Sequence, residues 1–440
     1  MNNQLDQIVV TAQSRDRTER LKQIRQAVRS AAYFDIGDER VARVRDIIST
    51  IAGRDDRDQA VLEFTGKFDG VSLSTQQLAV TPHELENAHK QLDADLLNSL
   101  RKAIANVKKY QAEILITQDP SRPAKTGIRY SPLRRVGICI PGAAAPLPST
   151  VIMTAVPARV AGVAEIAVVS PPRHNRDIHP VILGLCWELG ITEVYRVGGV
   201  QAVAALALGT ETIRAVDKIV GPGNQWVQTA KKELFGRVGI DLIAGPSEVL
   251  IIADDNANPA WVAADMLSQA EHDPASAVVF TTSQRFAANV LAELKVQLAG
   301  ITRREQAARC LINYGAIVIF DSLYEMIAQA DAFATEHLEI HCGPDSRKIA
   351  SRINNAGAIF IGDYSPVAVG DYWAGPSHTL PTGTTARFFS ALTANDFLKS
   401  TSIIEYDKDA LAADAADIIR IAQAEGLDAH ARSVEIRLRK

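Results

Sequence analysis

The sequence has few cysteines, and none of them are close together. The four cysteines among the 440 residues are Cys139, Cys186, Cys310 and Cys342, and no two form a CxxC pair. Thiols scattered in this way do not suggest a disulfide framework. We therefore expect reduced cysteines, as in the cytosol.

Long apolar runs and an excess of charge are also absent. The most apolar long window, residues 151–169, contains Pro157, Arg159 and Glu165, so it is not a membrane span. The first residues lack the apolar core of a signal peptide. A net charge of −4 without a block of Lys and Arg gives no electrostatic reason to expect nucleic acid. We expect a cytoplasmic protein that binds neither membranes nor nucleic acids.

The sequence does contain an alternation of short β-branched runs and helical stretches. From Arg135 onward, helix-like segments separate "VGICIPG", "AEIAVVSPP", "EVYRVGG" and "DKIVGPG". A second series starts at "SEVLIIAD" (247–254) and continues with "SAVVFTTS", "GAIVIFDS" and "GAIFIGDY". This alternation is typical of βαβ units. It predicts an α/β fold with two Rossmann-like, doubly wound lobes and helical arms at both ends.

Helical segments flank and complete these lobes. We expect residues 1–34 to form an N-terminal helical arm, and residues 35–135 to join residues 245–384 in a first α/β lobe. Residues 136–244 would form the second lobe, and residues 385–440 a C-terminal arm. An apolar stripe in "KDALAADAADIIRIAQAEGLDAH" requires that this arm dock on its own chain or on a partner subunit.

The stretch "SQAEHDP" ends a predicted helix that starts at Asn258-Pro259, an N-cap followed by proline at the first helical position. Gln269 and His272 are three positions apart, so they share one helix face. Together they could bind a metal ion. Alternatively, they belong to a solvated last turn, where a histidine is favoured by the helix dipole.

Three other segments offer side chains for chemistry. In "TEHLEIH", Glu336 and His337 form a natural acid/base pair, unless the segment is a strand whose polar residues face water. In "VGDYWAGPSHTLPT", Asp371 and His378 are on a predicted loop at the carboxyl end of a strand, a usual place for site residues. The aspartate could also be a simple turn former. In "AEGLDAH", Glu425 and His430 flank a helix break that could equally be a surface cap.

The glycine-rich turns offer a weaker signal. "GPGNQW" has Gly221 and Gly223, but Trp226 stands where the dinucleotide fingerprint requires a third glycine. Spacing alone therefore leaves NAD binding as a hypothesis that only the predicted topology supports.

Taken together, these segments resemble the histidinol dehydrogenase family over roughly residues 35–437. The motifs that carry the resemblance occur in the family's order, and they are "KFDGV" (67–71), "VGGVQAVAALALGT" (197–210), "VDKIVGPGNQWVQTAK" (216–231), "AGPSEVLIIAD" (244–254), "AADMLSQAEHDP" (263–274), "TEHLEI" (335–340), "VGDYWAGPSHTLPT" (369–382) and "AEGLDAH" (424–430). The resemblance implies oxidation of L-histidinol through L-histidinaldehyde to L-histidine, with two NAD⁺ used in succession.

The resemblance also implies the site. One zinc ion per subunit would be held by Gln269, His272, Asp371 and His430, a ligand set of imidazole and oxygen atoms that suits zinc. His337 matches the general base that takes the alcohol proton, and Glu336 the base that activates water for the second step. The residues implied to contact the substrate are Ser247, Gln269, His272, His337, Asp371, Glu425 and His430, and His378 is expected to line the same pocket.

For the cofactor, Gln201 and Asn224 match the NAD-contacting positions of the family. The sequence departs from the family's pattern at Cys139, where tyrosine is common, at Ala143 in a turn that usually has two glycines, and at Ser377, where asparagine is usual. The family's C-terminal arm crosses to the second subunit of a homodimer. Glu425 and His430 would thus complete the partner's site.

Three alternatives remain to be weighed against this interpretation. A related zinc and NAD dehydrogenase of another small alcohol, such as a sulfonated diol, is disfavoured because Glu425 suits a cationic substrate. A zinc hydrolase in which Glu336 activates metal-bound water leaves the two α/β lobes without a purpose. A non-catalytic binding protein leaves the acid/base pair idle.

Overall fold

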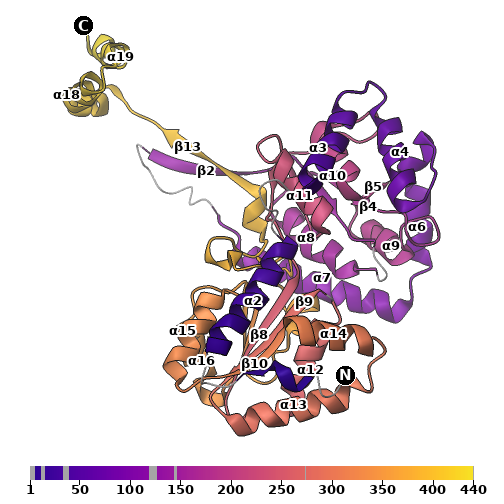
Figure 1. The fold of residues 1–440 in the computed structure, drawn as a ribbon. Coiled ribbons are helices and arrows are strands. Elements are labelled where there is room, and N and C mark those ends of the chain that lie inside the picture. The colour runs from indigo at the N-terminus through magenta and orange to yellow at the C-terminus, as the bar shows by residue number, and fades with distance from the viewer. Residues whose placement is uncertain are drawn as a thin grey trace. The chain divides into compact units, whose positions relative to one another are not determined.

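Two parallel β-sheets organise the larger part of the chain (Figure 1). The computed structural model describes residues 5–10, 15–32, 39–117, 126–142, 146–272 and 274–439. The chain divides into two compact units. The larger unit comprises Met1–Leu115 with Leu133–Phe397, and the smaller one Ile116–Pro132 with Leu398–Lys440.

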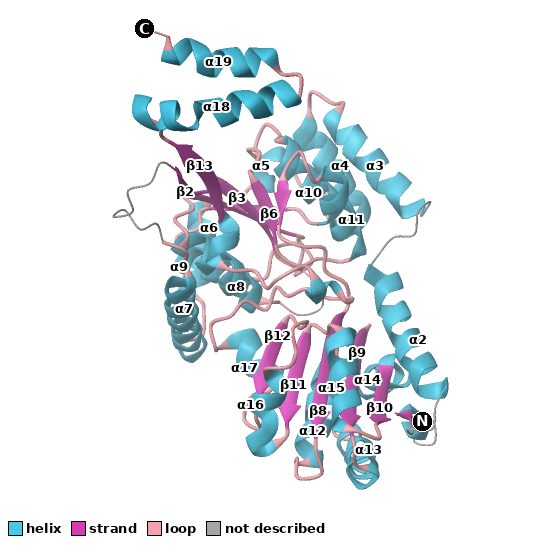
Figure 2. Ribbon diagram, turned by 90° about the vertical axis from the view of Figure 1, so that its left-hand side faces the viewer, coloured by secondary structure: helices cyan, strands magenta, loops and turns pink. Residues whose placement is uncertain are grey.

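The first sheet has six strands in the order β1-β10-β9-β8-β11-β12, all parallel. Figure 2 shows five of them, from β12 to β10, side by side. Their bounds are β1 (Val9–Val10), β8 (Ser247–Ala253), β9 (Ala275–Thr281), β10 (Gly315–Ile319), β11 (His337–His341) and β12 (Ala358–Ile361). After β1 at one edge, the chain returns to this sheet in the centre at β8, moves outward through β9 and β10, and then crosses to the other side for β11 and β12.

The second sheet repeats this plan with five strands in the order β5-β4-β3-β6-β7. All neighbouring strands are again parallel. The strands are β3 (Arg135–Cys139), β4 (Glu165–Ser170), β5 (Glu193–Arg196), β6 (Lys218–Val220) and β7 (Gly239–Ile240). The order reverses between β3 and β6, as it does between β8 and β11 in the first sheet. An α/β fold with two parallel sheets was predicted from the sequence and is confirmed.

Helices cover both faces of the first sheet because its strands are apolar on both sides. On one face, Val249 and Ile251 pack with residues of helices α12 to α14. On the other face, Leu250 and Ile252 pack with residues of α2, α15 and α16. The bounds are α2 (Arg15–Ala32), α12 (Pro259–Ala270), α13 (Gln284–Leu298), α14 (Arg304–Tyr314), α15 (Leu323–Phe333) and α16 (Ser346–Ala350). Period-two alternation along β8 thus divides one strand between two cores.

The second sheet has helices from two parts of the chain. The bounds of these helices are α3 (Glu39–Ala52), α4 (Arg57–Asp69), α5 (Thr75–Leu78), α6 (Pro82–Lys90), α7 (Ala94–Ile114), α8 (Pro148–Val160), α9 (Pro180–Glu188), α10 (Gly199–Leu208) and α11 (Gln225–Leu234). Val44, Ile47 and Ile51 of α3 share a core with the alanine-rich α10. Likewise, α6 packs on α9 and α7 on α8.

This packing differs from the grouping that we predicted. Residues 35–135 were expected in one lobe with residues 245–384, yet their described helices α3 to α6 pack on the second sheet and its helices. Residues 1–34 were expected to form an arm, yet β1 pairs with β10, and Leu21 and Ile24 are buried against the first sheet. The apolar stripe of a helix indicates that the helix packs on another element. It does not show which of the two sheets that element belongs to.

The smaller unit contains an antiparallel pair of strands and two helices, and it is described here by itself. Strands β2 (Thr126–Pro132) and β13 (Leu398–Ile404) pair along their full length. Helices α18 (Lys408–Ala424) and α19 (Asp428–Leu438) follow, and Asp407 caps the first of them by accepting from Ala410 N. The predicted arm began at residue 385, but residues 385–397 belong to the larger unit, where Phe397 is fully buried.

Short helical turns complete the described structure: η1 (Asp6–Ile8), η2 (Gly343–Asp345), η3 (Thr385–Arg387), η4 (Ala394–Phe397) and α17 (Val367–Tyr372). Within the described ranges, no helix has both the length and the apolarity needed to cross a bilayer.

Candidate active site

A carboxylate and an imidazole meet at the amino end of the first sheet. Glu336 immediately precedes β11, His337 is its first residue, and Ser247 begins the neighbouring strand β8. The Ser247 hydroxyl donates to Glu336 Oε2 at 2.5 Å, and Glu248 N donates to the same oxygen at 2.8 Å. These two donors fix the Glu336 carboxylate in one orientation. Its pKa is raised, because burial outweighs the opposing effect of His337 and these donors.

His337 is buried and has two different ring environments. Its Nδ1 is 3.0 Å from the Glu248 carbonyl oxygen and 3.5 Å from Glu336 Oε2. Its Nε2 is 3.5 Å from Asp371 Oδ1, and among the described residues this buried nitrogen has no hydrogen-bond partner. Because a carbonyl can only accept, Nδ1 carries a proton, and Nε2 is the nitrogen that exchanges one.

The pKa of His337 follows from its neighbours. Burial lowers the pKa, but the Glu336 and Asp371 carboxylates and the Glu248 carbonyl together raise it to about 9. Any cation that neutralises the charge of Asp371 would therefore lower the pKa of His337 toward neutral pH.

Asp371 is on the short helix α17 and not on a loop, so our prediction of a loop at the carboxyl end of a strand was wrong. The helix follows β12, and the 3.5 Å approach to His337 shows that it returns to the amino edge of the sheet. Gly370 permits this return, because a Cβ atom there would lie 2.6 Å from the Phe360 ring. The glycine thus allows its neighbour Asp371 to reach the site.

Helix α12 brings two further predicted ligands to the same edge. Asn258 caps its start by accepting from Ala260 N, with Pro259 at the first helical position, as predicted. Gln269 is 4% exposed, and its Nε2 has no hydrogen-bond partner among the described residues. His272 follows the helix and keeps an exposed edge. Desolvation of its ring lowers the pKa, which the Asp371 carboxylate partly opposes. The oxygen of a buried amide, an imidazole and a carboxylate are a ligand set that suits zinc.

The remaining predicted ligand, His430, is in α19 of the smaller unit, and Glu425 follows α18 there. Both side chains are exposed. The larger unit alone therefore supplies three of the four predicted metal ligands.

The loop after α17 contacts the helix that follows β3. Ser377 Oγ donates to the Met153 carbonyl at 2.9 Å, and His378 Nε2 is 3.4 Å from Thr150 Oγ1. Burial lowers the pKa of His378, and the Asp371 charge partly opposes this. These contacts join the catalytic edge of the first sheet to the second lobe. They also show that serine at position 377 makes its own hydrogen bond.

Two cavities lie at the carboxyl edge of the second sheet. One, of about 290 Å³, is lined by the turns after β3 and β6, among them Pro141, Gly223 and Asn224. The other, of about 580 Å³, is lined by Gln201, Asn224 and Trp226 together with cationic side chains. Gln201 is buried, and neither atom of its amide has a hydrogen-bond partner among the described residues. Both predicted cofactor residues therefore line these cavities. Of the three family departures, Ala143 lies outside the described residues.

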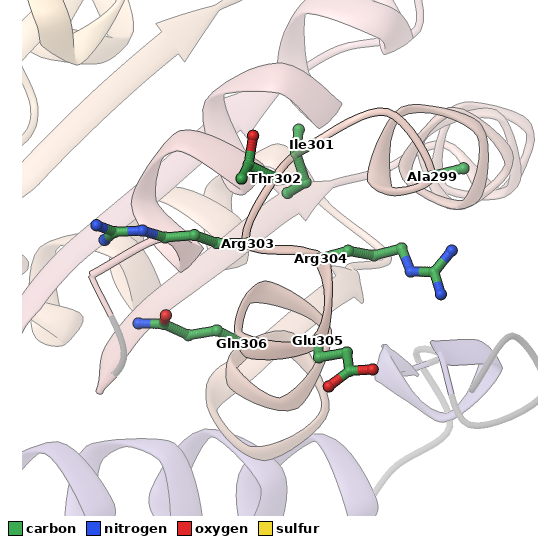
Figure 3. Close-up of a pocket in the computed structure, with 7 residues that line it drawn as sticks. All are labelled: Ala299, Ile301, Thr302, Arg303, Arg304, Glu305 and Gln306. Carbon is green, nitrogen blue, oxygen red and sulfur yellow. The ribbon is translucent and has the colours of Figure 1, made fainter.

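A third depression, of about 450 Å³, lies where α14 begins (Figure 3). Arg303 and Gln306 point to one side of it and Arg304 to the other. Most of the residues that line it are exposed, so it lacks the buried polar groups of the first site.

The sequence did not draw attention to several buried polar residues. Glu248 accepts from Gly383 N at 3.0 Å, and burial together with the Glu336 charge raises its pKa to about 8. Along β11, Glu339 and His341 are buried as completely as His337. The alternative in which these polar residues face water is therefore wrong. Their strict alternation with Leu338 and Ile340 was the feature of the sequence that could have indicated a strand with all of its polar residues on one face.

Glu339 and His341 also belong to a group with Asp265, in which one ligand atom from each residue lies within 4.8 Å of the others. This group is separate from the metal set that we predicted. Within the described ranges, it is the one cluster of three Asp, Glu, His or Cys residues with this spacing.

The chain is similar to proteins of one family. A family model described as histidinol dehydrogenase matches residues 35–438. The chain is 44% identical over 428 residues to a histidinol dehydrogenase of Geobacillus kaustophilus, covering 96% of this chain and 99% of that protein. It is 47% identical over 382 residues to one of Rhodopirellula baltica, covering 86% and 83%. A crystal structure of histidinol dehydrogenase from Elizabethkingia anophelis matches with a TM-score of 0.89 and 32% identity, covering 98% of this chain and 97% of that chain.

Proposed function

The chain belongs to the histidinol dehydrogenase family, and from this premise we propose that it oxidises L-histidinol through L-histidinaldehyde to L-histidine, with NAD⁺ as the hydride acceptor in both steps. The chain is accordingly an oxidoreductase of histidine biosynthesis. The observation that supports the chemistry most strongly is the buried Glu336–His337 couple, 3.5 Å from Asp371.

A zinc ion fits the residues at this edge. Gln269, His272 and Asp371 would hold it, with His430 as the fourth ligand. Gln269 would bind the ion through its amide oxygen, since the amide nitrogen is a donor. The buried Nε2 atoms of Gln269 and His337 have no hydrogen-bond partner among the described residues, which leaves them available to a bound substrate. When bound, the ion would position the substrate's amine and imidazole and neutralise the Asp371 carboxylate.

The two proton transfers belong to the protein. In the first step His337 Nε2 takes the hydroxyl proton of the alcohol while the hydride leaves the carbon for NAD⁺, which gives the aldehyde. In the second step Glu336 takes a proton from water as the water oxygen adds to the aldehyde carbon, and a second hydride then leaves for a second NAD⁺. Neutralisation of Asp371 removes one of the causes that raise the pKa of His337 to about 9, so the imidazole becomes a better base near neutral pH.

The cofactor is expected at the carboxyl edge of the second sheet, where open α/β folds bind dinucleotides at the reversal of strand order. Gln201 offers an amide whose two polar atoms have no partner within the described part of the chain. Asn224 caps α11 and lines both cavities. Burial raises the pKa of Cys139 to about 12, so its thiol stays protonated and is no nucleophile.

A homodimer would complete the site. The smaller unit exposes Ile404, Ile421 and Ile436, each more than half accessible, and apolar side chains of this kind are normally covered by a partner. In the site of the other copy, Glu425 would then supply a carboxylate that contacts the substrate. His430 would supply the fourth zinc ligand. The cytoplasmic location expected from the composition remains a prediction.

The nearest alternative is a related zinc and NAD dehydrogenase of another small alcohol. Glu425 favours histidinol, because a carboxylate attracts a substrate with an amine and repels a sulfonate.

One assay separates these possibilities. NADH formation is followed from a limiting amount of L-histidinol, with zinc added, and two NADH are expected per substrate molecule. No NADH from L-histidinol would overturn the proposal, and a single equivalent would limit the enzyme to the alcohol step. A sulfonated diol serves as the comparison substrate.

A further inference from the structure

The polar face of β11 continues below the catalytic pair. His337, Glu339 and His341 share one face of the strand, because alternate residues point to the same side. In the parallel register, His337 is opposite Val249 and Glu339 is opposite Ile251, and both of these partners pack toward α12. Glu339 is therefore a fully buried carboxylate on the α12 side of the sheet. A buried carboxylate needs specific partners.

Its partners come from three elements. Glu339 Oε1 accepts from Val367 N, the first residue of α17, at 2.8 Å. Glu339 Oε2 is 3.4 Å from His341 Nε2 on the same strand. The carboxyl of Asp265, in α12, has an oxygen within 4.8 Å of Glu339 and His341 ligand atoms. Burial and the Glu339 charge raise the pKa of Asp265 to about 7, so that the two carboxyl groups can share a proton. One side chain thus joins α12, β11 and α17 to each other.

The same three elements carry the proposed site. Asp265 precedes Gln269 by one helical turn, and Val367 precedes Asp371 by the same interval, roughly 6 Å along each helix axis. Glu339 follows His337 by two positions, so its side chain lies next to the imidazole on the same sheet face. Glu339 therefore contacts α12 and α17 about one helical turn before the residue that each helix contributes to the proposed site.

We propose that Glu339 is a positioning residue, which sets the separation of Gln269, His272 and Asp371 around His337 by binding Asp265 and the start of α17. The inference rests on the proposed zinc site. Hydrogen bonds behind the ligands of a metal site typically change metal affinity by about 10- to 100-fold. The group could instead hold a second cation. A proton shared by Asp265 and Glu339, with the imidazole of His341 nearby, already balances the charges of this group. We therefore choose a positioning role for Glu339 over a second cation site.

Three variants of the full chain test this role. In Glu339→Leu, the contacts with Val367 N, His341 and Asp265 are all lost. In Glu339→Gln, the amide oxygen can still accept from Val367 N, and the amide nitrogen can donate to the Asp265 carboxylate. Ile340→Ala is the matched control, because Ile340 is fully buried on the opposite face of the same strand. Its loss creates a cavity without touching the polar group.

Zinc affinity is measured by competition with a chelator, alongside melting temperature and the KM values for both substrates. Glu339→Leu is expected to weaken zinc binding by about 10-fold or more and to raise the KM for L-histidinol, with the KM for NAD⁺ unchanged. Glu339→Gln should restore most of the affinity. Ile340→Ala should lower the melting temperature and leave zinc affinity close to that of the parent.

Hydrogen exchange in the metal-free protein gives a readout that needs neither zinc nor turnover. The peptide that spans α17 should lose protection in Glu339→Leu and keep it in Ile340→Ala and Glu339→Gln. Equal zinc affinity in Glu339→Leu and the parent, or an equal loss in Ile340→Ala, would overturn the proposal. Two metal ions per parent chain and one in Glu339→Leu would replace it with a second cation site. A parent chain without zinc would defeat the proposed function, and the exchange result would still decide whether Glu339 holds α17.

Discussion

The two sheets of this protein have the same strand order and use opposite edges. In the second sheet, the cavities lie at the carboxyl edge, beside the turns that follow β3 and β6. In the first sheet, Ser247, Glu336 and His337 are at the amino ends of their strands. Asp371 reaches the same edge because α17 runs back along the sheet. Strand order alone therefore does not determine which edge of a parallel sheet carries chemistry.

The two edges differ in the part of the molecule that each of them contacts. The amino edge of the first sheet is joined to the second lobe by Ser377, which donates to the Met153 carbonyl, and by His378, whose Nε2 is 3.4 Å from Thr150 Oγ1. The second lobe offers its carboxyl edge, where glycine-rich turns leave room for a ligand. Proton-transfer groups on one lobe can therefore face a hydride acceptor on the other.

The largest expected effect is at the catalytic edge. His337→Ala should lower kcat by about 100- to 10,000-fold, because it removes the proposed base of the first step. Zinc content should stay close to that of the parent, since His337 is not one of the predicted ligands. The measurement is steady-state NADH formation with metal analysis. His174→Ala, at an exposed imidazole, is the control, and a similar loss in both variants would contradict the assignment.

A second change at this edge should separate the two oxidations. Glu336→Gln keeps an acceptor for Ser247 Oγ and Glu248 N but removes the proposed base of the hydration step. We expect the first NADH to form and the second to be slowed by about 100-fold or more. Single-turnover NADH counts and trapping of the aldehyde would detect this. Equal slowing of both steps would show that Glu336 serves them both.

The cofactor edge should respond to steric filling. A Cβ atom at Gly142 or Gly198 would lie 2.6 Å from Pro171, so Gly198→Ala must displace the turn that borders the cavity. We expect the KM for NAD⁺ to rise by about 10-fold, the usual order for overpacking strain, with zinc affinity unchanged. Gly127→Ala, where a Cβ would meet nothing within 4 Å, is the control. An unchanged KM for NAD⁺ would remove this edge from the cofactor site.

The smallest effect concerns stability against pH. The pKa of Glu248 is raised to about 8 from an ordinary 4.5, by burial and the Glu336 charge. The folded state therefore holds this proton more tightly than the unfolded state. The stabilisation is complete below pH 4.5 and is lost as the pH rises toward 8. Between these pH values the free energy of unfolding should fall by about 1 to 3 kcal/mol less in Glu248→Gln than in the parent, as measured by urea unfolding. An unchanged slope would show that Glu248 is not the group responsible.

The sequence predicted the elements better than their neighbours. Strand 247–253 and helix 259–270 were recognisable from β-branched runs and from Asn258-Pro259. The helix ends at Ala270, however, so His272 lies just beyond the helix on which we had expected it to share a face with Gln269. The helical state of Asp371 was missed, because α17 is only one and a half turns long, with Gly370 inside it. Glu339 and His341 were missed because a polar residue in a strand carries no mark of burial until its partners are known.

The pairing of β1 with β10 has a consequence for how the chain folds as it is synthesised. Val9 must wait for Ile317, roughly 300 residues later, which corresponds to about 15 to 60 s of translation. The strands of the second sheet and the helices that pack on it all precede β8 in the chain, so they can form in the meantime. Strand β1 is therefore among the last elements to be placed. A chain that stalls before β10 is expected to hold a finished second sheet and an N-terminal segment without its strand partner.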